Sequence, residues 1–372
     1  MTIDFTPRVQ LTPDAVNITT ANYHVVLSRP FDMEQIALDA QAQKRPRHTL
    51  WALSQMLSAT IHQPQGYSVS LTDKILSKIT GASQPHHWAM ARTLSKQLTS
   101  KDTVFCIGED SGFPIAALCG GKPNSPKLAV FVHNIDRPRG RLTLKLFDLR
   151  NRIDLFMTNT AVKADFLRQY INLPPEQVCL VTEQTDTRFF TPGLASPDKQ
   201  RPIVGSGGLE QRDYRTFAEA IGLLDVDAKV CAVSPNAKKM ADTFPEVMPE
   251  NMSVKFYNWP DLVQLYRDSD VVVISLKAHN YQAGLTTLFE SMSCRRPVIM
   301  TRTPGLVTEL IDAGIVRGVE PADPEGMREA ILDLLNNPEK AEEQAQRGYE
   351  LVNREYNSEQ YVEYIAAKVR SL

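Results

Sequence analysis

The stretch QAGLTTLFE at residues 282–290 decides the fold, and SMSCRRPVIM at residues 291–300 follows it directly. Gly284 opens a predicted short helix, and the apolar run at residues 297–301 predicts a buried strand. Backbone amides at the start of a helix, beside glycine and threonine, form a ready site for a phosphate group. Glu290 lies nearly two turns further on, where its carboxylate can accept hydrogen bonds from a sugar diol. A site that binds phosphate at one end and a sugar diol at the other suits a nucleotide sugar.

The same stretch resembles the donor-binding signature of glycosyltransferase family 4, whose members are retaining enzymes with the GT-B fold. That family carries a Glu-x7-Glu pattern followed by a helix and a strand that begins with proline and valine. Here the second glutamate is Glu290, but Gln282 occupies the first position. The resemblance implies that a nucleotide-sugar donor contacts Gln282, Ala283, Gly284, Leu285, Thr286 and Glu290, with Gln282 near the transferred sugar. An amide at Gln282 can bond to hydroxyl groups but brings no charge.

Length and composition limit the possible classes of protein. At 372 residues the chain is too long for one ordinary core, which predicts two domains. A hydrophobic content of 42% with 23% charged residues is typical of a soluble globular protein. The net charge of −2 argues against a general polyanion binder, so no nucleic-acid partner is expected.

The cysteines and the chain start bear on location. The five cysteines are scattered and odd in number, which favours buried thiols in a reducing compartment. No apolar run approaches the roughly 18 residues that span a bilayer, and the N-terminus lacks a signal-peptide core. We therefore expect a cytoplasmic protein, at most peripheral at the inner face of a membrane.

Short apolar runs alternate with helical patterns along the chain, which predicts parallel α/β architecture. The strands expected in the first half are Tyr23–Leu27, Thr103–Ile107, Leu128–His133, Ile153–Thr158 and Val178–Thr182. Those expected in the second half are Pro202–Gly205, Lys229–Val233, Ser253–Tyr257, Asp270–Ser275, Pro297–Thr301 and Val316–Glu320. The segment 191–202 is rich in proline and glycine and predicts a linker.

This order predicts two doubly wound, Rossmann-like domains that face a cleft, with ligands at the carboxyl ends of the strands. We expect an acceptor-side domain at residues 1–195 and a nucleotide-sugar domain at residues 196–350. The resemblance to the GT-B fold implies that residues 351–372 form a helix that crosses back to the first domain.

The loop GSGGLEQR at residues 205–212 follows one of these strands and leads into a predicted helix. Its glycines let the backbone approach an anion, and the Arg212 guanidinium can pair with phosphate. In family 4 the matching segment is Gly-Arg-x4-Lys-Gly, which puts Arg212 at the lysine position and Gly207 at the arginine position. The resemblance therefore implies donor contacts at Gly207 and Gly208, with Arg212 on the diphosphate as both a binding and a catalytic group.

His133 ends the apolar strand of the first half and is followed by Asn134. A histidine here is by itself an ordinary strand-end residue. The resemblance implies instead a catalytic position near the donor sugar, because the family commonly carries a His-Asp pair at this point.

Asp268-Ser-Asp270 has the spacing of a divalent-metal motif, but it lies at a step from helix to strand that favours a structural turn. We expect no metal and no cofactor, with the nucleotide sugar as substrate and cationic groups on the leaving diphosphate.

The densest basic and apolar stretch is residues 137–152, with Arg137, Arg139, Arg141 and Lys145. A helix over 143–151 with Leu142, Leu146 and Leu149 facing the sheet is the simpler interpretation. The alternative is a face that lies on an anionic membrane, supported by a second basic cluster at residues 44–48. The turn EDSGFP at residues 109–114 could contact an acceptor or cap a helix through Asp110 or Ser111.

The sequence thus predicts a retaining, metal-independent hexosyltransferase that uses a nucleotide-diphosphate sugar, with UDP favoured on family frequency, and an acceptor that is a lipid, a glycan or a small molecule. Two alternatives remain open. One is a binding or scaffold protein that kept the fold and lost turnover. The other is a nucleotide-sugar epimerase with the same fold.

Overall fold

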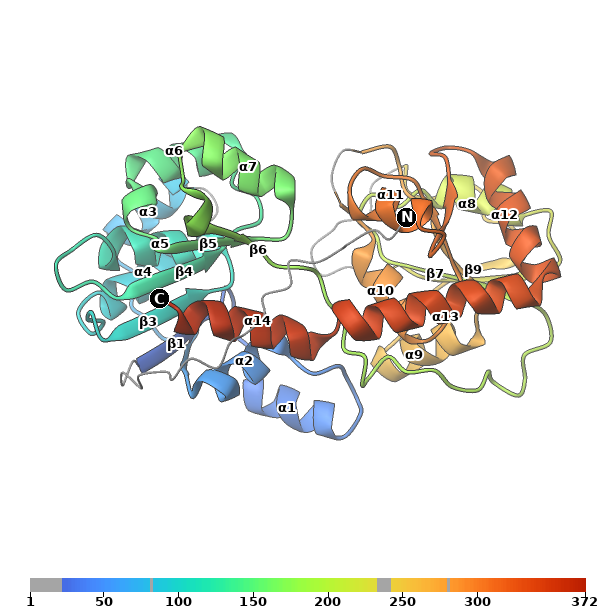
Figure 1. Ribbon diagram of the computed structural model, residues 1–372, viewed down its shortest axis with the longest axis horizontal. Helices are drawn as coiled ribbons and strands as arrows, with labels where there is room; N and C mark the ends of the chain where they lie inside the picture. Colours follow the sequence, from blue (N-terminus) through green and yellow to red (C-terminus); the bar gives the residue numbers. More distant parts are fainter. Residues whose placement is uncertain (1–21, 81–82, 233–241, 280–281) are drawn as a thin grey trace.

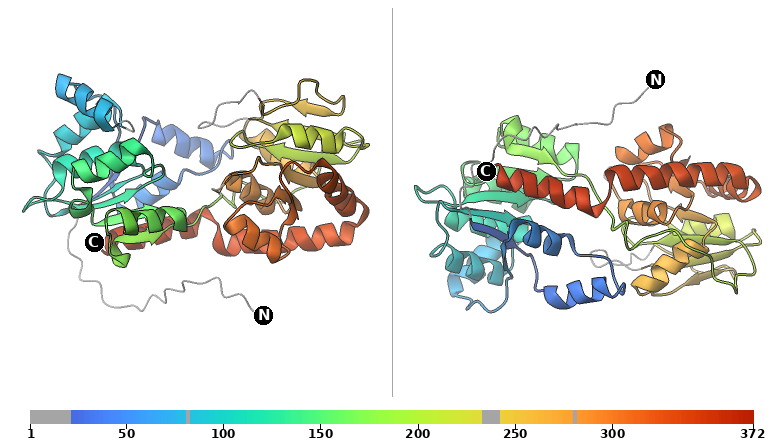
Figure 2. Two further views of the ribbon diagram at one scale, coloured as in Figure 1. Left: turned by 90° about the horizontal axis from the view of Figure 1, so that it is seen from above. Right: turned by 60° about the horizontal axis from the view of Figure 1, so that its bottom comes forward.

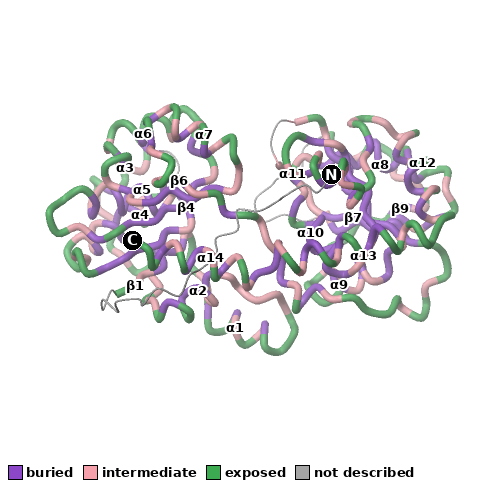
Figure 3. The backbone as a smooth tube through the Cα atoms, viewed as in Figure 1, coloured by how far each residue is buried: buried purple, intermediate pink, exposed green. Residues whose placement is uncertain are grey.

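The computed structural model describes residues 22–80, 83–232, 242–279 and 282–372, which form two α/β halves side by side (Figure 1). Each half contains one sheet of six parallel strands. The buried segments run along the strands of both sheets, and the helices expose their outer faces (Figure 3).

The first sheet has the order β2-β1-β3-β4-β5-β6. Its strands are β1 (Asn22–Val26), β2 (Thr60–His62), β3 (Asp102–Cys106), β4 (Lys127–Phe131), β5 (Leu155–Thr158) and β6 (Val178–Leu180). Its helices are α1 (Met33–Gln41), α2 (Thr49–Leu57), α3 (Leu71–Thr80), α4 (Pro85–Leu94), α5 (Glu109–Cys119), α6 (Pro138–Leu146) and α7 (Ala161–Tyr170), with 3-10 turns at Leu149–Asn151 and Pro175–Gln177.

The second sheet has the order β12-β11-β10-β7-β8-β9. Its strands are β7 (Ile203–Gly207), β8 (Asp227–Cys231), β9 (Met252–Val254), β10 (Val271–Ile274), β11 (Val298–Thr301) and β12 (Arg317–Val319). Its helices are α8 (Tyr214–Ile221), α9 (Trp259–Asp268), α10 (Leu285–Ser293), α11 (Leu306–Asp312), α12 (Pro324–Asn336) and α13 (Pro338–Glu355). The order reverses between β7 and β10, as in doubly wound nucleotide-binding sheets.

The C-terminal helices connect the two halves, as Figure 2 shows from two further sides. Leu351, Val352 and Tyr356 pack with α10 in the core of the second half. α14 (Ser358–Arg370) then crosses to the first half, where its apolar residues pack with α2, β1 and β3. The predicted fold, with two doubly wound domains and a C-terminal helix that crosses back, is confirmed.

The chain passes between the halves twice, once between β6 and β7 and once between α13 and α14, and the two passages are bonded to each other. The Thr185 amide donates to the Tyr356 carbonyl at 2.9 Å, and the Ser358 amide donates to the Thr185 carbonyl at 3.0 Å. The Ser358 hydroxyl also donates to Gln184 Oε1 at 2.5 Å. These bonds hold the two passages in one register.

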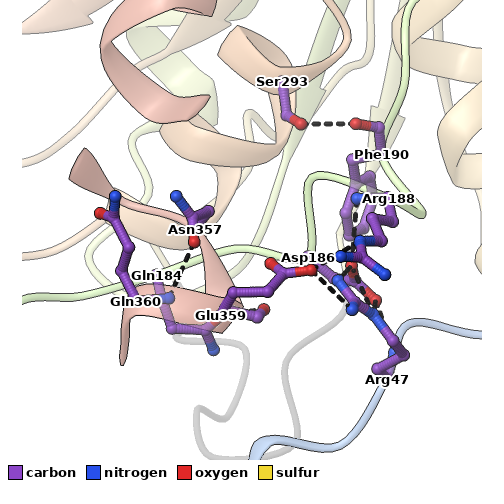
Figure 4. A network of polar contacts seen from close by, with 10 residues as sticks. Arg47, Gln184, Asp186, Arg188, Phe190, Ser293, Asn357, Glu359 and Gln360 are labelled. Carbon is purple, nitrogen blue, oxygen red and sulfur yellow. Dashed lines mark hydrogen bonds and ion pairs between the residues drawn. The ribbon is translucent and has the colours of Figure 1, made fainter. Parts of the chain in front are cut away.

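Arg47 binds both passages from the loop before α2 (Figure 4). Its Nε donates to both carboxylate oxygens of Asp186 at 3.0 Å, and its backbone amide donates to Asp186 Oδ2 at 2.7 Å. Its Nη1 donates to Glu359 Oε1 at 2.7 Å, where Arg188 pairs as well. Burial opposes ionisation of Asp186, but the hydrogen bonds from Arg47 outweigh it and lower the pKa of this carboxyl.

Several expectations about the first half were wrong. The sequence did not predict β2, α1 or α3, and residues 109–114 form the start of α5, which Gly108 caps, so neither Asp110 nor Ser111 is the cap. Gly112 made this segment resemble a turn in the sequence. A Cβ at Gly112 would lie 2.4 Å from Val130 Cγ1, so glycine is needed here for close packing of the helix on β4.

In the second half, the strand expected at Lys229–Val233 is β8, although Val233 lies outside the described residues.

α6 also differs from expectation. It begins at Pro138 instead of Thr143, because proline is favoured in the first helical turn. The buried face of α6 is formed by Thr143 and Leu144, so Leu142 and Leu146 point outward, with 51% and 53% of each residue exposed. Of the three leucines expected to be buried, only Leu149, in the following 3-10 turn, is in the core.

The contacts of Arg47 with Asp186 and Glu359, which we call the ionic clamp, give a prediction about stability. We expect Arg47→Ala to lower the free energy of unfolding by about 2 kcal/mol, because it leaves a buried carboxylate unpaired. This is less than for a fully buried pair, since the Arg47 side chain is 34% exposed. Urea unfolding would measure it. The control is Arg168→Ala, which breaks the exposed pair with Asp165 and should change stability by less than about 0.5 kcal/mol.

The stability of wild type and that of Arg47→Ala should depend differently on pH. The pKa values of Asp186 and Glu359 are lowered in the folded protein, so their stabilisation is present at neutral pH and is lost as the pH falls through the folded values. The gap between wild type and Arg47→Ala should therefore narrow on acidification. A gap that does not change with pH would contradict an ionic clamp.

Candidate active site

A cleft of about 1300 Å³ lies between the two halves and is lined by residues of both. The first half contributes residues that follow β1, β3 and β4, and the second contributes Glu210 and residues 282–286. These segments come after the carboxyl ends of parallel strands, where α/β proteins bind ligands. The second-half segments follow β7 and β10, the pair at which the strand order reverses.

The start of α10 faces this cleft. Gly284, Leu285 and Thr286 line it, and the cap residue Gly284 has φ +83° with no side-chain cap. A Cβ at Gly284 would lie 2.9 Å from both Ile274 and Met300, so the tight turn requires glycine. The first amides of a helix have no acceptor within the helix, and here they are available to an anion in the cleft.

Arg212 lies beneath this helix start. It is 3% exposed, and its guanidinium donates to Gly207 O at 2.7 Å, Glu210 O at 3.0 Å and Thr287 Oγ1 at 3.1 Å. All three acceptors are uncharged, and burial lowers the pKa of Arg212. The charge of Glu210 raises the pKa of Arg212 in part, but burial outweighs it. Because burial of a cation among neutral hydrogen-bond acceptors is costly, an anion bound at this place would be favoured.

Two glycines let Arg212 come close to the helix start. A Cβ at Gly208, where φ is +90°, would lie 2.5 Å from Arg212 Nη2, and one at Gly284 would lie 3.4 Å from Nη1. The guanidinium and the uncapped amides of α10 therefore form one positive site. Gly207, Gly208 and Arg212 are below the cleft wall and do not line it.

Glu290 is also buried, with 6% of the residue exposed, on the inner side of α10. Its Oε2 accepts a hydrogen bond from the Tyr266 hydroxyl at 2.7 Å. Burial raises the pKa of Glu290 to about 7, against the hydrogen bond from Tyr266 and the charge of Arg212. A Cβ at Gly207 would lie 3.4 Å from that Tyr266 hydroxyl, so the pair lies directly beneath the end of β7.

His133 lines the opposite wall of the cleft. Glu109, at the start of α5, accepts from the amides of His133 and Asn134 at 2.8 and 2.9 Å. His133 Nε2 lies 3.2 Å from the Ile107 carbonyl, and because a carbonyl oxygen only accepts, this contact places a proton on Nε2. Glu109 therefore orients the loop that carries His133, a role that the sequence did not reveal because residues 109–114 resembled a turn.

Gln282 and Ala283 line the cleft next to Gly284. A Cβ at Gly305, where φ is +91°, would lie 2.8 Å from Gln282 Nε2. The lack of a side chain at Gly305 therefore leaves room for the side-chain amide of Gln282. Across the cleft, the Ser28 hydroxyl donates to Asp110 Oδ1 at 2.6 Å. The loop after β1 is thus tied to α5.

The carboxylates of Asp268 and Asp270 are bonded to the linker. Asp268 accepts from the Ser196 amide at 2.7 Å, and Asp270 pairs with Lys199 and accepts from the Ile203 amide at 2.8 Å. Neither lines the cleft. Among residues 22–80, 83–232, 242–279 and 282–372, no group of three or more His, Cys, Asp or Glu could hold a metal ion.

Comparisons with known proteins agree with this architecture. Residues 201–337 match the family model "Glycosyl transferases group 1". The fold is similar to Anabaena Alr3699/HepE in complex with UDP, with 14% identity, a TM-score of 0.64, and coverage of 94% of this chain and 100% of that one. No curated protein matches the sequence.

Two further solved structures share the fold. Sucrose-phosphate synthase from Thermosynechococcus elongatus is 14% identical with a TM-score of 0.65, covering 94% of this chain and 98% of that one. The UDP-forming α,α-trehalose-phosphate synthase from Burkholderia vietnamiensis is 12% identical with a TM-score of 0.66, covering 95% and 99%. The chain has the GT-B fold, and with the group 1 domain in its second half it is an enzyme, a glycosyltransferase. The scaffold alternative is not favoured.

The raised pKa of Glu290 predicts how stability depends on pH. Between the usual carboxyl value of 4.5 and about 7, the folded protein keeps a proton that the unfolded chain releases. Stability should therefore fall across this range, by about 3 kcal/mol at about 1.4 kcal/mol per pH unit. Glu290→Gln keeps an acceptor for Tyr266 and has no such proton.

The measurement is the melting temperature of both proteins at pH 5 and pH 8. The variant should match wild type at the lower pH and be more stable at the higher one. An equal difference at both values would mean that Glu290 does not titrate near neutrality.

Proposed function

We propose that the protein is a retaining, metal-independent glycosyltransferase of the family 4 type that transfers a hexose from a UDP-sugar to an acceptor. The observation that carries this proposal is the buried Arg212 guanidinium beside the uncapped start of α10; the helix start lines the interdomain cleft, and Arg212 lies behind it. Such a site stabilises the diphosphate that leaves when the sugar is transferred. UDP is favoured because similar structures were determined with it.

In this proposal each predicted residue has one role. Arg212 and the amides of Gly284, Leu285 and Thr286 bind the diphosphate, and Glu290 accepts hydrogen bonds from the ribose. His133 and Gln282 face the donor sugar from opposite walls of the cleft. Gly207 and Gly208 let the nucleotide approach the Tyr266–Glu290 pair and Arg212.

The chemistry requires no protein nucleophile. Negative charge develops on the leaving diphosphate, and fixed donors already aimed at that position lower the barrier. Arg212 and the helix start supply the positive charge that a metal ion would otherwise supply. The cleft walls hold the acceptor hydroxyl against the departing group, which removes much of the entropic cost of the reaction.

The acceptor is a lipid, a glycan or a small molecule, and the protein works in the cytoplasm. Arg29, Arg137, Arg139 and Lys163 line the first-half wall. The carboxylates of Glu109, Asp110 and Glu183 line the same wall, so its charge alone does not select an acceptor. The described residues include no helix that is long and apolar enough to cross a membrane.

The diphosphate role of Arg212 is tested by Arg212→Met. Losing a charge-assisted hydrogen bond should weaken UDP binding by about 10- to 100-fold, while uridine, which has no phosphate, should bind as before. Titration calorimetry with both ligands measures this. The matched control is Arg215→Met on the neighbouring helix turn, where the side chain is exposed. Equal losses for UDP and uridine would show that Arg212 only supports the local structure.

The ribose role of Glu290 is tested by Glu290→Ala. The variant should lose affinity for UDP but bind 2′,3′-dideoxy-UDP as wild type does, because that ligand has no diol to donate. Wild-type affinity for UDP should also rise with pH through about 7, since the ionised carboxylate is the better acceptor. If the variant binds UDP as tightly as wild type does, Glu290 does not bind the ribose.

A further inference from the structure

α3 and α6 present aliphatic side chains to solvent. On α3 these are Leu71, Ile75 and Ile79, with 77%, 58% and 39% of each residue exposed. Their spacing of four residues places them on one face of the helix. On α6 the exposed leucines are Leu142 and Leu146, also four residues apart. α3 and α6 contact each other and lie side by side (Figure 1), so we call these five residues and the basic residues around them the α3–α6 surface.

The exposed charges on these two helices are all positive. They are Lys74 and Lys78 on α3 and Arg139, Arg141 and Lys145 on α6, with Arg137 at the cap of α6. The carboxylate that α3 contains, Asp73, is 2% exposed and pairs with Arg92 at 2.9 Å. A chain with a net charge of −2 therefore concentrates positive charge around one apolar surface.

Part of this basic rim is held in place. Lys145 Nζ lies 4.4 Å from the ring centre of Tyr170 on α7, and the Arg141 guanidinium lies 5.0 Å from that of Phe166. These cation–π contacts keep both side chains at the margin of the surface. Leu142 and Leu146 follow these two basic residues directly in the sequence of α6, and about half of each leucine is exposed to solvent.

The surface borders the cleft. Thr80, at the end of α3, lines the cleft, and so do Arg137, Pro138, Arg139 and Gly140 at the start of α6. A partner bound to the surface would therefore lie next to the cleft opening on the first-half side.

We propose that the α3–α6 surface docks on an anionic lipid bilayer. Leucine and isoleucine side chains on one helix face enter the interfacial region, while lysine and arginine around them bind the headgroups. A bilayer matches both properties at once, because the exposed charges on the two helices are all positive and the exposed residues between them are aliphatic. The exposed carboxylates of Asp136 and Asp148 lie just outside the two ends of α6. This docking does not depend on which donor or acceptor the cleft binds.

The experiment is flotation of the full chain with two kinds of vesicle, one of phosphatidylcholine alone and one that also contains phosphatidylglycerol. Wild type should float with the anionic vesicles and less with the neutral ones. Lys74→Ser with Lys78→Ser should weaken binding to anionic vesicles by about 25-fold, about fivefold for each charge. Ile75→Glu with Leu142→Glu should remove binding altogether.

The matched control is Leu223→Glu, which adds a charge at an aliphatic residue that is 82% exposed in the second half, and it should float as wild type does. All variants should keep the wild-type melting temperature, because the changed side chains are exposed. Three results would overturn the proposal: wild type that does not float with anionic vesicles, equal flotation with both vesicle types, or a wild-type dimer that Ile75→Glu with Leu142→Glu makes monomeric. UDP affinity, measured separately, reports on the cleft alone.

Discussion

The arrangement of the two halves depends on one buried carboxylate. Asp186 lies on the first passage of the chain between the halves, and Arg47 binds it while also reaching Glu359 on the second passage. The backbone bonds of Thr185 with Tyr356 and Ser358 then align the two passages. Because the cleft is lined from both halves, the distance between His133 on one wall and Gln282 on the other is set by this junction.

The start of α10 shows how glycine residues control the placement of a charged group. Gly208 and Gly284 have left-handed backbone conformations, and neither position has room for a side chain. Because both positions lack side chains, the Arg212 guanidinium lies against the start of α10, so a full positive charge and the positive end of the helix dipole act at one point. Burial of Arg212 among neutral hydrogen-bond acceptors costs free energy that a bound anion would offset, so the proposed binding of a diphosphate would be linked to the stability of this turn.

Sequence patterns predicted every strand of the two sheets except β2, because parallel, buried strands are continuous apolar runs and β2 is a short edge strand with no fully buried residue. They also predicted that Gln282, Gly284 and His133 line the cleft, since each follows a strand. They failed for α5, where Gly112 and Pro114 are needed for contact with β4 but are typical of turns. The capping of His133 by Glu109 and the contact of Tyr266 with Glu290 were not predictable, because each joins residues far apart in sequence through the sheet geometry.

The crossing of α14 also has a consequence for synthesis on the ribosome. Val362, Ile365, Ala366 and Val369 belong to the same core as Val25, Phe105 and Leu155 of the first sheet. The part of that sheet face which α14 covers, beside α2, therefore stays uncovered while the whole second half is translated, although N-terminal domains generally fold first. The half of the protein that is made first completes its core last, when the final residues of the chain emerge.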